Sequence, residues 1–186
     1  MAVQVQRLRF TVDEYHRLAQ AGILGEDDRV ELLDGEIIVM APIGSRHAAA
    51  VKRLNALLTR HVGTQAIVGV QDPIDLGAYS EPQPDLVLLR PRPDFYASAH
   101  PQPPDVLLLV EVADASLPYD REVKLPLYAR AGIPEVWLVN LASDTVEVYR
   151  SPSPQGYEDA HTLPRGQRLS PHLLPQVSVA VEDILG

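Results

Sequence analysis

The stretch Val106-Leu-Leu-Leu-Val-Glu-Val112 decides the fold of this 186-residue chain. Its apolar residues favour β-structure and follow one another without alternating, which is typical of a strand buried on both faces. Helices and further strands on either side of it indicate a mixed α/β domain around one core. The acid in this run, Glu111, is costly to bury unless a positive group meets it.

A second run of the same kind, Pro84-Asp85-Leu-Val-Leu-Leu89, also carries an acid, at its start. Each acid alone could be a solvated strand end or a strand-entry residue that bonds nearby amides. Two such strands followed by Lys124 suggest instead a Mg²⁺ or Mn²⁺ site, because carboxylates suit these ions and leave room for water and phosphate. A metal there would activate water and neutralise phosphate charge, and a lysine would position the water. This is the chemistry of an enzyme that cleaves phosphodiesters.

The remaining secondary structure follows from caps, turns and periodicity. Thr11 with Glu14 forms a capping-box pattern, and Asp34-Gly35 between two apolar runs predicts a hairpin. Ser45 can cap the strongest helix, and Gly63 can end it. We predict helices over residues 11–19, 45–61 and 120–131, strands over 30–33, 36–40, 67–70, 84–89, 106–112, 135–139, 145–149 and 177–181, and a turn over 151–156.

Composition limits the function classes. The net charge of −9 and the pI of about 5.0 argue against a protein that coats nucleic acid nonspecifically, although one local basic surface would still suit an enzyme. The absence of cysteine excludes disulfides and thiolate metal sites, so oxygen or imidazole would hold any metal. With no apolar run long enough to span a membrane and no signal stretch, we expect a cytoplasmic protein without a membrane partner, and residues 1–186 as a single domain.

Three further side chains are candidates for the site. His47 shares a helix face with apolar residues and should point toward the sheet, where it could approach a metal or phosphate; a buried histidine bonded to a carbonyl is an equal reading. Glu36 in the hairpin could add a carboxylate or lie at the surface. Asp114 could be a third acid at the site or a loop cap.

Arg46, Arg53 and Arg60 recur every seven residues along the predicted helix over 45–61. They form a stripe beside its apolar face. Such a stripe is usually a solvated helix face, and the alternative is a ridge that contacts nucleic-acid phosphates.

An ordered set of motifs resembles a large bacterial family of restriction-endonuclease-like proteins, over roughly residues 11–150. The motifs are ELLDGEIIVM from Glu31, then His47, PDLV from Pro84, VEV from Val110, YDREVK from Tyr119 and YARAGIPEVWLV from Tyr128. The resemblance implies the PD-(D/E)XK nuclease fold, a central mixed β-sheet flanked by helices, here with an N-terminal helix and β-hairpin.

The resemblance also implies roles for three residues. Asp85 and Glu111 match the metal-binding acids of that family, and Lys124 matches a lysine displaced onto the following helix, since Ala113 stands at the usual strand position. Two features depart from the pattern. Asp114 opens a stretch where relatives tend to have Ser-Pro-Ser, and Pro126 strains a helix interior, so the helix should kink or begin near Leu125.

The expected function is therefore metal-dependent endonuclease cleavage of DNA. A catalytically inactive binding or regulatory module on the same fold is the alternative. A third possibility is an enzyme acting on another phosphate substrate, but the chain lacks the glycine-rich loop that nucleoside triphosphates require. We expect a homodimer, because cleavage of both duplex strands suits two sites related by a twofold axis.

Overall fold

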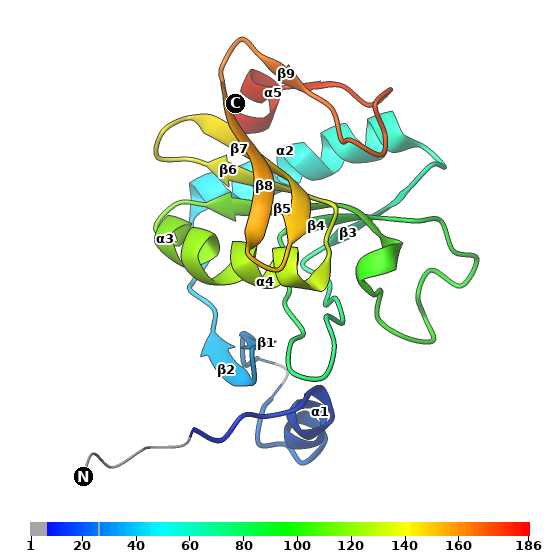
Figure 1. The fold of residues 1–186 in the computed structure, drawn as a ribbon, viewed down its shortest axis with the longest axis vertical. Helices are drawn as coiled ribbons and strands as arrows, with labels where there is room; N and C mark the ends of the chain where they lie inside the picture. Colours follow the sequence, from blue (N-terminus) through cyan, green and yellow to red (C-terminus); the bar gives the residue numbers. More distant parts are fainter. Residues whose placement is uncertain (1–6, 26) are drawn as a thin grey trace.

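The computed structural model describes residues 7–25 and 27–186 and is built on a mixed six-stranded sheet (Figure 1). Neighbouring strands are antiparallel except β5 and β6, which are parallel. The strands, in spatial order, are β3 (Ile67–Val70), β4 (Leu86–Leu89), β5 (Val106–Ala113), β6 (Glu135–Asn140), β7 (Thr145–Ser153) and β8 (Gly156–Pro164).

Helices cover both faces of this sheet (Figure 1). Strand β5 lies inside, and all eight of its residues are buried. Leu108 and Val110 pack into the core beneath α2 (Ser45–Val62) and α5 (Val181–Leu185), while Leu109 and Ala113 pack beneath α4 (Leu125–Ala131). Each fully buried leucine or valine stabilises the fold by roughly 1.5–3 kcal/mol. The mixed α/β architecture predicted from the buried runs is confirmed.

An N-terminal unit made of α1 (Val12–Gln20), β1 (Val30–Leu33) and β2 (Glu36–Val39) lies beside one end of the sheet (Figure 1). Thr11 and Glu14 form the predicted capping box. The β1–β2 turn places Asp34 and Gly35 at φ 49° and 82°, the left-handed backbone that an Asp-Gly hairpin turn requires. The hairpin joins the segment ahead of β4 through a bridge between Leu32 and Glu81.

The helical segment after β5 differs from the continuous helix predicted over 120–131. It consists of α3 (Leu117–Tyr119), a π-helical turn η2 (Asp120–Lys124) and then α4. The Leu125 amide reaches back five residues to the Asp120 carbonyl, and Pro126, which has no N–H to donate, follows directly. Of the two expected consequences of Pro126, a kink or a later start, helix α4 does begin at Leu125, and Lys124 lies in the π-helical turn just before it.

Element ends show three more differences. Gly44 is the N-cap of α2, so the predicted Ser45 cap is wrong, and Ser45 is the first helical residue. The predicted turn over 151–156 is narrower, because Ser153 pairs with Gly156 and the strands β7 and β8 continue up to it. The tail forms β10 (Val179–Ala180) against β9 (Arg168–Leu169) and then α5, and η1 (Pro103–Asp105) precedes β5.

Candidate metal-binding site

Asp85 and Glu111 meet at one end of the central sheet. Asp85 directly precedes β4 and Glu111 lies in β5. The β4–β5 register pairs Leu86 with Val110, which places the two acids beside each other. The Asp85 amide faces Glu111 Oε2 at 3.4 Å. The two acids, distant in sequence, are therefore neighbours in the structure.

Asp85 is held by donors from three directions. Its Oδ2 lies 2.9 Å from His47 Nε2 and accepts a hydrogen bond of 2.9 Å from the Val112 amide. Gln71 Nε2 donates to Oδ1 over a longer 3.4 Å. The hydrogen bond to Asp85 raises the pKa of His47, and burial opposes this only in part. His47 therefore points toward the sheet, as predicted, and bonds a carboxylate and not a carbonyl.

Glu111 lies on the same side of β5 as Leu109 and Ala113, the side that α4 covers. The Tyr128 hydroxyl donates to Glu111 Oε1 at 2.6 Å, and Lys124 Nζ lies 3.3 Å from the same oxygen. Burial raises the pKa of Glu111 to about 8, despite the opposing attraction of Lys124. The carboxyl is thus fixed in place but short of positive charge.

Lys124 lies between two carboxylates. Its Nζ is 3.1 Å from Glu31 Oε1 and 3.3 Å from Glu111 Oε1, and only 6% of the residue is exposed. Burial alone would lower the pKa of Lys124, but Glu111 and Glu31 outweigh it and raise the pKa above its ordinary value. The ammonium therefore stays charged. Lys124 and Asp120 are the two buried residues of the π-helical turn.

Lys124 and the carboxylates around it line one cavity of about 510 Å³. This volume is within the usual range for sites that bind small ligands. Acids outnumber bases on its wall, which carries Glu31, Asp85, Glu111, Asp114 and Asp120 against Arg29, Lys124 and His47. Burial raises the pKa of Asp120, and the Ser116 hydroxyl donates to its carboxylate at 2.7 Å. Such a wall attracts a cation.

The donor atoms fit a hard divalent cation. Glu111 Oε2 and Asp85 Oδ1 have only long polar contacts of 3.4 Å within the described residues, so both keep lone pairs to offer. Mg²⁺ and Mn²⁺ prefer oxygen ligands and retain water. Asp85 and Glu111 could therefore hold such an ion while His47 and Tyr128 orient them.

The other predicted candidates are placed differently. Asp114 is exposed at the border of the cavity. Glu36 pairs with Arg7 at 2.9 Å and does not line this cavity. Arg46 donates to the Leu141 carbonyl.

The remaining arginines of the predicted stripe lie further along α2. Arg53 donates to the Leu185 carbonyl at 2.9 Å, and Arg60 is exposed. Arg46 and Arg53 thus each hydrogen-bond a carbonyl of a segment that lies beside α2. Contact of this stripe with nucleic acid stays a prediction.

Sequence reasoning did not assign Glu31, Tyr128 or Asp120 to the site. Glu31 carries the same signal as Glu111, an acid within a short apolar strand, and is only 3% exposed. Tyr128 gives no such signal, because a tyrosine on the buried face of a helix is normally a core residue.

The sheet order, the flanking helices and the paired acids define the restriction-endonuclease-like class of α/β proteins. Residues 12–182 match the model of the Uma2 family, described as "Putative restriction endonuclease", and the chain belongs to that family. A solved structure of a putative nuclease from Anabaena variabilis is similar, with a TM-score of 0.75 and 16% sequence identity, covering 95% of this chain and 97% of that one. No curated protein matches the chain. Among the described residues, no helix combines the length and apolar character needed to cross a membrane.

Proposed function

We propose that the protein is a metal-dependent nuclease that hydrolyses phosphodiester bonds of DNA. The observation that carries this proposal is that Asp85 and Glu111 lie side by side at the wall of one open cavity, with the buried ammonium of Lys124 next to Glu111. The family description and the fold of the neighbouring structure support the nuclease class. The DNA substrate and the dependence on Mg²⁺ or Mn²⁺ are part of the proposal.

Each residue has a definite task in this proposal. Asp85 and Glu111 would hold the cation, which when bound would activate water and neutralise charge on the phosphate. His47 and the Val112 amide fix the Asp85 carboxylate, and Tyr128 fixes Glu111. Lys124 supplies a positive charge at the cavity wall that can orient water or stabilise charge on the phosphoryl group.

Arg29 gives the cavity a second cation for contact with a nucleic-acid backbone. Its side chain is exposed and borders the cavity. Phosphate contacts of this kind position a duplex without reading its sequence. A homodimer, in which two such sites would face the two strands, belongs to the proposal as well.

The second candidate function is a catalytically inactive binding or regulatory module on the same fold. The net charge of −9 favours it, because an acidic surface repels nucleic acid. A shared fold does not by itself establish catalysis.

Cleavage of supercoiled plasmid separates the two functions. The purified protein should nick the plasmid with MnCl₂ or MgCl₂ and leave it intact in EDTA. Nicking that continues in EDTA would contradict the metal-dependent proposal. Intact plasmid with every cation, together with an absence of saturable Mn²⁺ binding in calorimetric titration, would favour the inactive module.

Replacement of His47 by alanine should weaken Mn²⁺ binding by roughly 10–100-fold, because side chains that orient metal ligands typically contribute this much. The variant removes the 2.9 Å bond from the ring to Asp85. Calorimetric titration of Mn²⁺ into metal-free protein measures the change. His61→Ala is the matched control, since His61 is exposed near the other end of the same helix. Equal affinities of both variants would rule out an orienting role for His47.

A further inference from the structure

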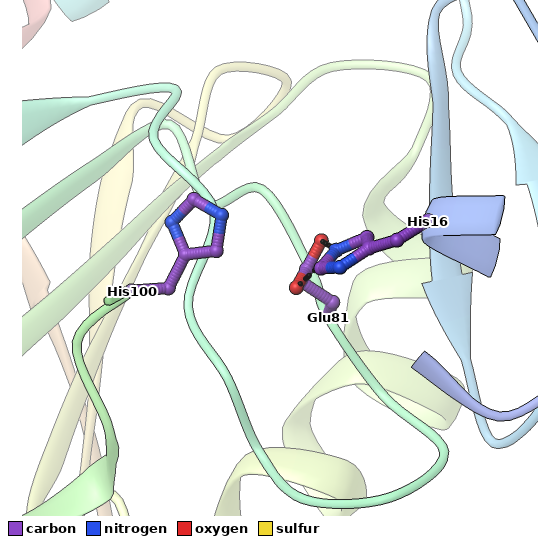
Figure 2. Close-up of side chains that lie close together, drawn as sticks. All are labelled: His16, Glu81 and His100. Atoms are coloured by element: carbon purple, nitrogen blue, oxygen red, sulfur yellow. Dashed lines mark hydrogen bonds and ion pairs between the residues drawn. The ribbon is translucent and has the colours of Figure 1, made fainter. Parts of the chain in front are cut away.

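We propose that His16, Glu81 and His100 form a second metal site, which binds a transition-metal cation such as Zn²⁺. Figure 2 shows the three side chains approaching from helix α1, from the segment ahead of β4 and from the proline-rich loop between β4 and β5. None of them lines the cavity that contains Asp85 and Glu111. The proposed site is therefore separate from the candidate nuclease centre.

The ligand atoms are close to a coordinating arrangement. One such atom from each residue lies within 4.8 Å of those of the other two. His16 Nε2 is 2.9 Å from both oxygens of Glu81. Zinc–ligand bonds of roughly 2.0–2.1 Å in a tetrahedral site separate the ligand atoms by about 3.4 Å. The histidine and the carboxylate already lie near this separation, and a rotation of the exposed His100 side chain can bring in the third ligand.

The charge balance at Glu81 also indicates a cation. Glu81 is only 5% exposed, and His16 is the only side chain within the described residues that hydrogen-bonds its carboxylate. Buried carboxylates are normally paired with a positive group or bound to metal. A divalent cation between the imidazole and the carboxylate would meet this requirement.

The backbone around the site is held in place on each side. The Asp75 amide donates to the Pro101 carbonyl at 2.9 Å, directly after His100 in the chain. The Val12 amide donates to the Ala78 carbonyl at 2.9 Å, which fixes the start of α1 against the segment that carries Glu81. These contacts bring the three ligands together without a metal, so binding would not require a large rearrangement.

The chemistry of the ligands selects the class of metal. Two imidazoles and one carboxylate suit Zn²⁺ and similar transition metals and leave a fourth position for water. Mg²⁺ prefers oxygen ligands and should not compete for these histidines. Because the ligands come from three separate segments, the bound ion would fasten the N-terminal helix to the two loops at this side of the sheet.

Calorimetric titration of ZnCl₂ into tag-free, chelator-treated protein tests the site. Binding should be saturable, and His16→Ala and His100→Ala should each weaken it by roughly 100-fold or more, beyond the effect of losing an orienting residue. His61→Ala, which removes another exposed histidine, should bind Zn²⁺ like the wild type. The titrations are made in an excess of MgCl₂, which competes at the Asp85–Glu111 centre and should not displace the Zn²⁺ bound by the two histidines.

Two controls make the outcome decisive. His100 is exposed, so metal-free His100→Ala should unfold at the wild-type temperature, and only the rise in unfolding temperature caused by Zn²⁺ should disappear. In excess MgCl₂, saturable Zn²⁺ binding that is as tight in both histidine variants as in the wild type, or no saturable binding, would each overturn the proposal. Because no cleavage is measured, failure of this site and failure of the nuclease proposal are distinguishable.

Discussion

Glu111→Gln and Asp85→Asn should each lower metal-dependent plasmid nicking by about three orders of magnitude. Each substitution keeps the size of the side chain but removes the charge that would hold the cation. Metal assistance contributes several kcal/mol to the transition state, and each 1.36 kcal/mol corresponds to a factor of ten in rate. The rate of supercoiled plasmid loss in MnCl₂ measures the effect.

The controls for these two variants lie on β8. Glu158→Gln and Asp159→Asn make the same chemical changes at exposed positions and should nick like the wild type. Circular dichroism would verify that all four variants are folded. If folded Glu111→Gln and Asp85→Asn retain the wild-type rate, these acids do not hold the catalytic metal.

The central part of the fold could be predicted because each element carried a strong local signal. The run containing Glu111 is apolar at successive positions, and the structure buries it between two helical layers. The Asp34-Gly35 turn and the Thr11–Glu14 capping box are each formed by residues close together in the sequence. These features depend on neighbours in the sequence, so one sequence was sufficient to recognise them.

The rest of the site depended on contacts between distant segments. Glu31 reaches Lys124 only because the hairpin folds against the helical turn η2, and no sequence pattern specifies that approach. Pro126 predicted a disturbance of the helix but not its form. The structure has a π-helical turn there, with Lys124 buried in it, and spacing along the chain could not predict this.

Lys124→Met should destabilise the metal-free protein by about 3–5 kcal/mol at pH 9, because loss of one partner leaves buried charges uncompensated. In the structure this ammonium is the shared partner of Glu31 and Glu111, both of which are buried. Urea unfolding in EDTA, followed by the fluorescence of Trp137, the single and fully buried tryptophan, measures the free energy of unfolding. Lys52→Met, at an exposed position of α2, is the control and should change it little.

The penalty for Lys124→Met should shrink as the pH falls. Burial already raises the pKa of Glu111 to about 8, and removal of the ammonium would raise it further. A carboxyl whose pKa is higher in the folded state binds more protons when folded. The free energy of unfolding therefore falls as the pH rises from the pKa of the unfolded state to that of the folded state. The variant should therefore lose stability between pH 6 and pH 9 more steeply than the wild type, and Glu111→Gln in the same chain should reduce that slope. A penalty that is the same at both pH values would show that Lys124 does not compensate these carboxylates.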